Sequence, residues 1–226
     1  IDDIARNNFI RDLECRELTI KGLQQMIGVS FTEQGITEEK NQRITTLCNT
    51  FGIRGDELGE AGMRLAKSQI LKRLDEGKLP EKVQLDGVPI MFERNETAVW
   101  LFNGVSYYTI RTKTQYVGAS QGFSFRVMKG VYYRVGSYKG EPIQTQYMSE
   151  EARGALIITN QNLYFWSPQK VLKMPLNKII SMQPYTDGIQ VVRDGANARP
   201  QIFKIDDPPF ACDAIARLHQ MGEAKQ

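Results

Sequence analysis

Short apolar runs separated by turn residues dominate the second half of the chain. Residues 155–167 hold two such runs, rich in Ile, Leu, Tyr and Phe, on either side of a polar Thr-Asn-Gln-Asn step. Similar runs occupy residues 171–176, 178–183 and 188–193. Runs of this length that are rich in β-branched and aromatic residues are typical of consecutive antiparallel strands. We therefore predict a series of antiparallel strands joined by short turns.

The first third of the chain has the periodicity of helices instead. We predict one helix over about residues 2–27 and a second that begins after Thr37, which suits the N-cap position. Apolar residues of the second helix recur at the spacing of one helix face: Ile44, Leu47, Cys48 and Phe51. A third helix is predicted over residues 56–76, with Gly77 as its stop. Residues 1–78 are therefore expected to be essentially all helix.

The periodicity changes after a polar connector at residues 79–86. Strands are predicted at residues 88–92 and 96–102, and strands then dominate the chain. Asn103-Gly104 lies between apolar runs, which is the strongest short signal for a β-hairpin turn. Asp187-Gly188 is a further turn candidate.

An amphipathic helix is predicted after the strands, over about residues 209–220. Asp206 and Asp207 can accept hydrogen bonds from its first turn. Its apolar positions fall on one face: Phe210, Ala211, Ala214, Ile215 and Leu218. The predicted fold class is α+β, with a small N-terminal helical domain over residues 1–80. An antiparallel β-barrel domain, closed by the C-terminal helix, is predicted over residues 85–222.

The composition is sufficient for both parts to fold. The chain has 226 residues, of which 41% are apolar, and this allows a packed core in a small and a medium domain. No apolar run approaches the length that crosses a bilayer, and the first residues lack the pattern of a signal peptide. We therefore expect a cytoplasmic protein, with association with a membrane surface as an alternative. Because there is no initiator methionine, we also expect that a preceding segment, such as an anchor or a partner domain, is missing.

Catalytic and metal-binding chemistry has little support in the residue pattern. The three cysteines are far apart and form no Cys-x-x-Cys pair, so neither a disulfide framework nor a zinc cage is indicated. His219 is the single histidine, which leaves little scope for a histidine-activated nucleophile. We expect no catalytic residue, no metal and no cofactor.

The net charge of +3 is unevenly distributed, with 13 basic against 14 acidic residues in the first 82 positions and 16 against 12 in the rest. Residues 105–140, here called the basic aromatic segment, contain no acidic residue and interleave Lys and Arg with Tyr and Phe. Such a surface suits anions. The candidate ligand-binding residues are Arg111, Lys113, Arg126, Lys129, Arg134, Lys139 and Tyr133. The alternative is that alternate aromatic residues face the barrel interior and the basic residues form its solvated face.

The stretch ITEEKNQRITTLCNTFGI, residues 36–53, resembles the helical pair of the TerB-like family. In that family acidic residues are associated with metal binding. Glu33, Glu38 and Glu39 cluster here, but a helix N-terminus favours carboxylates for electrostatic reasons alone. We expect the helix-terminus role and no metal.

The second half is similar to GRAM and bacterial pleckstrin-homology (PH)-like domains, in which a Leu-x-x-Thr-Asn strand and turn precede an apolar strand and a Pro-Leu-x-x-Ile strand. The matching positions are Leu156, Thr159, Asn160, Leu163, Phe165, Pro175, Leu176, Ile179, Ile180, Asp187, Gly188, Ile189, Phe203 and Phe210. The whole chain resembles bacterial proteins that join a TerB-like region to a PH-like region. The resemblance implies a PH-like barrel with a terminal helix.

Three functional classes are compatible with these features. The first is a non-catalytic interaction module, an adaptor or scaffold subunit that binds a protein partner within a larger complex, or an anionic lipid headgroup. The second is a nucleic-acid-binding protein that uses the basic aromatic segment to neutralise phosphates and stack on bases. The third is an enzyme, for which the chain offers no recognisable catalytic motif. We favour the first class.

Overall fold

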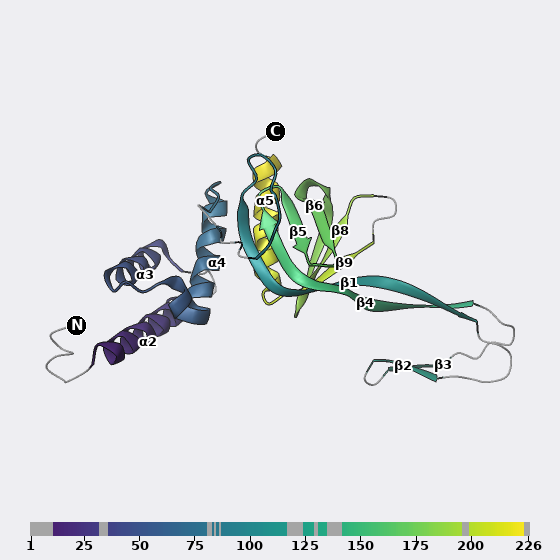
Figure 1. The fold of residues 1–226 in the computed structure, drawn as a ribbon, viewed down its shortest axis with the longest axis horizontal. Coiled ribbons are helices and arrows are strands. Elements are labelled where there is room, and N and C mark those ends of the chain that lie inside the picture. The colour runs from purple at the N-terminus through teal and green to yellow at the C-terminus, as the bar shows by residue number, and fades with distance from the viewer. Residues whose placement is uncertain are drawn as a thin grey trace.

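The computed structural model describes residues 11–31, 36–80, 83, 85, 87–116, 124–128, 131–134, 142–195 and 199–223. Its N-terminal part is helical and comprises α2 (Asp12–Ser30), α3 (Glu38–Thr50), the 3-10 turn η1 (Gly55–Leu58) and α4 (Gly59–Asp75) (Figure 1). The predicted helices are confirmed, apart from the part of the first helix that lies outside the described residues.

The helical part has a small hydrophobic cluster of its own. Thr37 is the N-cap residue of α3, and Gly77 follows α4 with a φ of 72°, as the sequence predicts for the start of one helix and the end of another. The buried members of the cluster are Leu23, Ile27, Ile44, Ile53, Leu58 and Leu65. Each helix contributes at least one of these side chains, so the cluster holds α2, α3 and α4 together.

The second part is an antiparallel sheet. Its strands are β1 (Ala98–Tyr116), β4 (Pro142–Thr159), β5 (Asn162–Trp166), β6 (Val171–Pro175), β7 (Ile179–Tyr185), β8 (Gly188–Arg193) and β9 (Gln201–Lys204). They are hydrogen-bonded in the order β6-β5-β4-β1-β9-β8-β7. Strands β2 (Ser124–Met128) and β3 (Val131–Arg134) form a separate pair. The predicted α+β class and the strands over residues 155–193 are confirmed.

The prediction of a closed barrel is wrong, because β6 and β7 are the two edges of the sheet and do not pair with each other. A 3-10 turn, η2 (Leu176–Lys178), follows β6 and contains the buried Leu176. It redirects the chain, so that β8 is the one described strand that pairs with β7. Helix α5 (Pro208–Glu223) contacts η2, β7 and β8 and covers this side of the open sheet.

The predicted hairpin at Asn103-Gly104 is also wrong, since both residues lie inside β1. The strand continues through a bulge, with Phe102 opposite Leu156 and Val105 opposite Gly154. Gly104 has a φ of 69°, which the extra residue of a β-bulge can require as readily as a tight turn. Long-range pairing with β4 decides between the two structures.

Residues 88–92 do not form the predicted strand. Their backbone makes local bonds instead, from the Val88 N–H to the Leu85 carbonyl and from the Ile90 N–H to the Val88 carbonyl. The apolar side chains of residues 83–92 pack on the outer face of the sheet, against Ala98, Ile157 and Tyr164, so the connector extends from residue 79 as far as the start of β1. Alternation of apolar and polar residues therefore predicts an extended segment with one side packed on the protein. Such a segment does not have to pair with another strand.

The main hydrophobic cluster joins the sheet to α5 and α4. The predicted face of α5 is confirmed, because Phe210, Ala211, Ala214, Ile215 and Leu218 are all buried. Ile70 and Leu74 of α4 belong to the same cluster, whereas Leu65 of α4 belongs to the helical cluster. Helix α4 thus packs on both parts of the molecule. The domain limits at residues 80 and 85 stay a prediction.

Strands β1 and β4 continue beyond the rest of the sheet as a two-stranded ribbon (Figure 1). Strand β9 pairs with β1 only over residues 106–109, and β5 pairs with β4 only over residues 155–158. The pairing of β1 with β4 nevertheless extends to Tyr116 opposite Pro142. The ribbon therefore has two free edges as far as the described strands are concerned.

Candidate functional site

The basic aromatic segment lies on and beyond this ribbon, and the structure describes only part of it. Arg111 and Lys113 are exposed on β1. Strands β2 and β3 hold Arg126, Tyr133 and Arg134, whose side chains lie outside the described residues, as do Lys129 and Lys139 entirely. Convergence of these seven residues on one ligand stays a prediction.

Arg111 has an acidic partner that the sequence did not reveal. Its Nε and Nη2 atoms donate to the two carboxylate oxygens of Glu151, each at 2.8 Å. The hydrogen bonds from Arg111, joined by one from Thr109, lower the pKa of Glu151 to about 2. On the same strand as Glu151, Glu150 accepts a hydrogen bond from the Tyr108 hydroxyl at 3.1 Å. Carboxylates of β4 thus neutralise part of the charge of β1.

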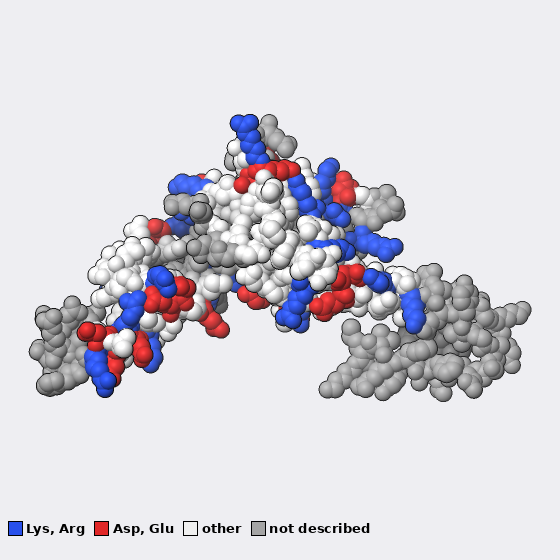
Figure 2. Space-filling model, viewed as in Figure 1, with Lys and Arg blue, Asp and Glu red and all other residues white. Residues whose placement is uncertain are grey.

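The distribution of charge over the molecule agrees with this local pairing. On the face shown in Figure 2, acidic and basic side chains are interspersed and do not gather into one patch. Several cations are paired across long sequence distances, such as Arg217 with Asp75 at 2.6 Å and Lys204 with Asp187 at 3.0 Å. The described residues therefore present no broad surface of one sign on this face.

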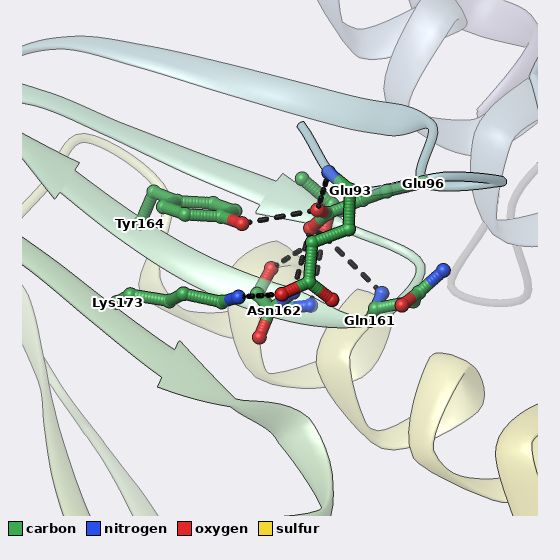
Figure 3. A network of polar contacts seen from close by, with 7 residues as sticks. Glu93, Glu96, Gln161, Asn162, Tyr164 and Lys173 are labelled. Atoms are coloured by element: carbon green, nitrogen blue, oxygen red, sulfur yellow. Dashed lines mark hydrogen bonds and ion pairs between the residues drawn. The ribbon is translucent and has the colours of Figure 1, made fainter. Parts of the chain in front are cut away.

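A polar network surrounds the half-buried Glu96, at the point where the connector enters β1 (Figure 3). Its Oε1 atom accepts hydrogen bonds from the Thr159 hydroxyl at 2.5 Å and the Asn162 amide at 2.8 Å. Its Oε2 atom accepts from the Tyr164 hydroxyl at 3.0 Å and the Glu93 backbone N–H at 2.9 Å. Each carboxylate oxygen thus has two donors.

This network stabilises an ionised carboxylate in a fixed place. Burial alone would raise the pKa of Glu96, but the hydrogen bonds from Thr159, Asn162, the Glu93 backbone and Tyr164 outweigh it and hold the pKa below its ordinary value. Burial and the neighbouring Glu96 carboxylate raise the pKa of Tyr164. Because the oxygens of Glu96 are already satisfied, the arrangement suits an anchor between the connector and the β4–β5 turn. It does not suit a proton acceptor for a substrate.

The edge strand β7 lies beside a hollow, and the two together form a candidate site. The hollow has a volume of about 340 Å³ and lies between β7, η2 and α5. Its lining residues are Leu176, Ile179, Ile180, Ser181, Met182, Ile215, Ala216, His219, Gln220 and Glu223. Ile180 is 66% exposed, so an apolar side chain of the edge strand is presented to solvent next to this hollow.

The chemistry of the hollow is mainly apolar. Among the described lining residues, Glu223 is the single Asp, Glu, Lys or Arg. His219 also lines the hollow, and its Nδ1 lies 3.7 Å from a Glu223 oxygen. Among the residues that the structure describes, no Lys or Arg lines it. An anionic headgroup would find no cation among these described residues, whereas an uncharged side chain would find Leu, Ile and Met side chains.

Reactive groups are sparse among the described residues. They contain no group of three or more His, Cys, Asp or Glu side chains that could hold a metal ion. Cys15, Cys48 and Cys212 are free thiols, and burial raises the pKa of both Cys48 and Cys212, which disfavours the nucleophilic thiolate. In the part of the chain that the structure covers, no helix is both long and apolar enough to span a membrane.

Comparison with known proteins gives one structural match. No protein-family model matches the chain, and no curated protein matches it. A crystal structure of the N-terminally truncated linker-DH/PH domains of p115-RhoGEF is similar with a TM-score of 0.28 and 9% sequence identity, over 91% of this chain. The chain spans 55% of the length of that structure. A TM-score this low carries no argument about fold or function.

Proposed function

We propose that this protein is a non-catalytic interaction module that binds an extended segment of a protein partner along β7, beside α5. The observation that carries the proposal is the free edge of β7 next to an apolar hollow. A PH-like assignment of the second part is included in the proposal. It is supported by the series of antiparallel strands followed by one amphipathic helix.

An added strand is the physical basis of the recognition. An edge strand presents unpaired backbone N–H and carbonyl groups, and an extended peptide can satisfy them while its alternate side chains enter a neighbouring pocket. Pro184 lacks a backbone N–H, so pairing is expected along the preceding residues 179–183. The hollow lined by Met182 and Ile215 would accept an apolar side chain of the peptide.

The opposite edge of the sheet provides a matched control. Val171 on β6 is 60% exposed and Ile180 on β7 is 66% exposed, so both are aliphatic residues at free edges with similar exposure. Glutamate at either position adds the same charge and removes similar apolar area. Only the change at Ile180 lies in the proposed site.

The test is a selection of linear random peptides on the purified full chain, followed by affinity measurements. Selected peptides should bind Ile180→Glu at least about tenfold more weakly than the parent protein and should bind Val171→Glu equally well. Bound peptide should shift the backbone amide resonances of residues 179–183. Equal losses in both variants, or shifts confined to β1 and β4, would contradict the proposal. Anionic vesicles and single-stranded DNA serve as comparison ligands, and tight binding to either one in place of peptide would also contradict it.

A further inference from the structure

The ribbon edge of β4 differs from the other free edges in its side chains. Residues 145–149 read Thr-Gln-Tyr-Met-Ser, with no charge and no proline. Tyr147 and Met148 are 47% and 55% exposed. None of the described strands pairs with β4 on this side before Ala155. This stretch is therefore an exposed, uncharged strand edge.

Sheet edges in natural proteins usually carry features that prevent further pairing, such as Lys, Pro or other charges. The other free edges of this molecule have them, with Lys173 on β6, Pro184 on β7, and Arg111 and Lys113 on the ribbon part of β1. The β4 edge at residues 145–149 lacks all of them. In addition, a two-stranded ribbon is only marginally stable in water without a further strand.

We propose that this edge pairs with the same edge of a second copy of the chain, in an antiparallel arrangement with the two-fold axis at Tyr147. The two seven-stranded sheets would then be continuous through β4 and its copy. The proposal is independent of the peptide site at β7, which lies at the end of the strand order.

The side chains of this stretch are complementary to themselves in that register. Tyr147 faces Tyr147 of the copy, Gln146 faces Met148, and Thr145 faces Ser149, as follows from antiparallel pairing about residue 147. Aromatic pairs and Thr–Ser pairs across strands are favourable, and like charges directly opposite each other are not. Self-pairing of β4 brings no like charges together, whereas self-pairing of the β1 edge would place Arg111 and Lys113 near their own copies. A second copy therefore fits the β4 edge better than the β1 edge.

The charge nearest Tyr147 is Arg111, which lies opposite it on β1 and is paired with Glu151 of the same chain. The nearest charged residues on β4 are Glu150 and Glu151, and Glu151 is held by Arg111 of its own chain. The Tyr108 hydroxyl donates to Glu150. These carboxylates lie beyond Ser149, outside the paired stretch.

Sedimentation velocity of the purified full chain over a range of concentrations tests the proposal. The parent protein should show a concentration-dependent shift from monomer to dimer, and Tyr147→Phe should behave in the same way. Tyr147→Lys and Tyr147→Glu should each weaken self-association by at least about tenfold, because each places like charges opposite each other at the axis. Thr112→Lys is the matched control, since Thr112 is exposed on β1 and lies one strand farther from the copy.

Mixing the two charged variants gives the decisive result. Tyr147→Lys and Tyr147→Glu should associate with each other more strongly than either does with itself, because the axis then joins opposite charges. Slower hydrogen exchange at residues 145–149 at high protein concentration should accompany the association, and near-ultraviolet circular dichroism should show that every variant is folded. A parent protein that stays monomeric throughout, or a dimer that neither charge reversal nor mixing changes, would overturn the proposal.

Discussion

At the scale of single residues, Glu96 is the clearest case of a side chain whose position is fixed by others distant in sequence. Three of its four donors come from the sheet, with Thr159 at the end of β4 and Asn162 and Tyr164 in β5. A buried carboxylate is costly when its oxygens lack partners and is tolerated when they are satisfied. The network therefore joins the connector to the sheet through one charged group.

The first prediction is that Glu96→Gln lowers the free energy of unfolding by about 1 to 3 kcal/mol at neutral pH. The amide nitrogen of Gln cannot accept hydrogen bonds, so two of the four donors lose their acceptor and the other two lose a charged one. Urea unfolding measures the change. Glu93→Gln is the control, because Glu93 is paired with Lys173 at an exposed position and should contribute only about 0 to 1 kcal/mol.

The destabilisation caused by Glu96→Gln depends on pH, and the direction of this dependence follows from the pKa of Glu96. The folded state lowers the pKa of Glu96 below its ordinary value of 4.5, so the unfolded chain binds this proton more readily. The stabilisation is therefore fully present above that ordinary value and is lost as the pH falls through the lower pKa of the folded protein. The difference between parent and Glu96→Gln should shrink on acidification. A difference that grows instead would show that the network does not favour the ionised carboxylate.

At the scale of elements, α5 is the helix on which the core of the sheet depends. Its buried face packs against the sheet, and its first turn is capped by Asp207, whose Oδ1 accepts from the Phe210 N–H at 3.2 Å. The aromatic rings of Trp100 and Phe210 meet edge to face at 5.0 Å.

The second prediction follows from this packing. Ile215 is 1% exposed, so Ile215→Asp should lower the free energy of unfolding by on the order of 4 kcal/mol, which is the scale expected for an unpaired charge in a core. Thermal unfolding followed by circular dichroism measures it. Ala216→Asp, one residue further on the exposed side of the helix, should have a small effect. Equal effects of the two substitutions would show that α5 is not anchored by this face.

The elements that could be predicted from the sequence are those defined by local signals. The capped helices and the short strands of residues 155–193 are correct because turn residues and periodicity act within a few positions. The Asp187-Gly188 turn is correct for the same reason, with Gly188 closing the β7–β8 hairpin against Tyr185. Asn103-Gly104 carries a similar local signal and is a bulge, because strand β4 pairs with both of its flanks.

Less of the candidate site could be predicted from the sequence. The basic aromatic segment has a visible composition, but the Glu151 partner of Arg111 is 40 residues away in the chain. The hollow beside β7 combines residues of η2 and β7 with residues of α5, which is distant from both in the sequence. Pro184 is a local signal for an edge strand, but it does not show which elements will lie beside that edge. Edges and ion pairs depend on the order of strands in space, which the sequence does not display.

At the scale of the whole molecule, the helical part is fixed to the sheet through α4. Lys67 is mostly buried, with its side chain 13% exposed, and its Nζ lies 2.9 Å from Asp207 of the α5 N-terminal region. The same ammonium lies 5.5 Å from the centre of the Phe210 ring and 5.7 Å from that of Trp100. Arg217 and Asp75 form a second contact between α5 and α4.

The third prediction concerns this contact between α4 and the region of α5. A double-mutant cycle of Lys67→Met and Asp207→Asn should give a coupling free energy of about 1 to 3 kcal/mol, since the Lys67 side chain is only 13% exposed. Asparagine keeps the capping role of Asp207, which limits the effect to the ion pair. The exposed pair Lys204 and Asp187 is the control and should give a much smaller coupling free energy, because water screens both charges. Equal coupling in the two cycles would show that the Lys67–Asp207 pair does not fix α4 to the region of α5.

The position of α4 between two hydrophobic clusters has a consequence during protein synthesis. Lys67 and Asp207 are 140 residues apart, and Ile70 and Leu74 share their cluster with residues of α5. Because a chain emerges from the ribosome N-terminus first, the helical part can assemble its own cluster while one flank of α4 still lacks its partners. That apolar flank stays uncovered until nearly the whole sheet and α5 have been made. Nascent chains halted before α5 should therefore be the ones that most need a chaperone.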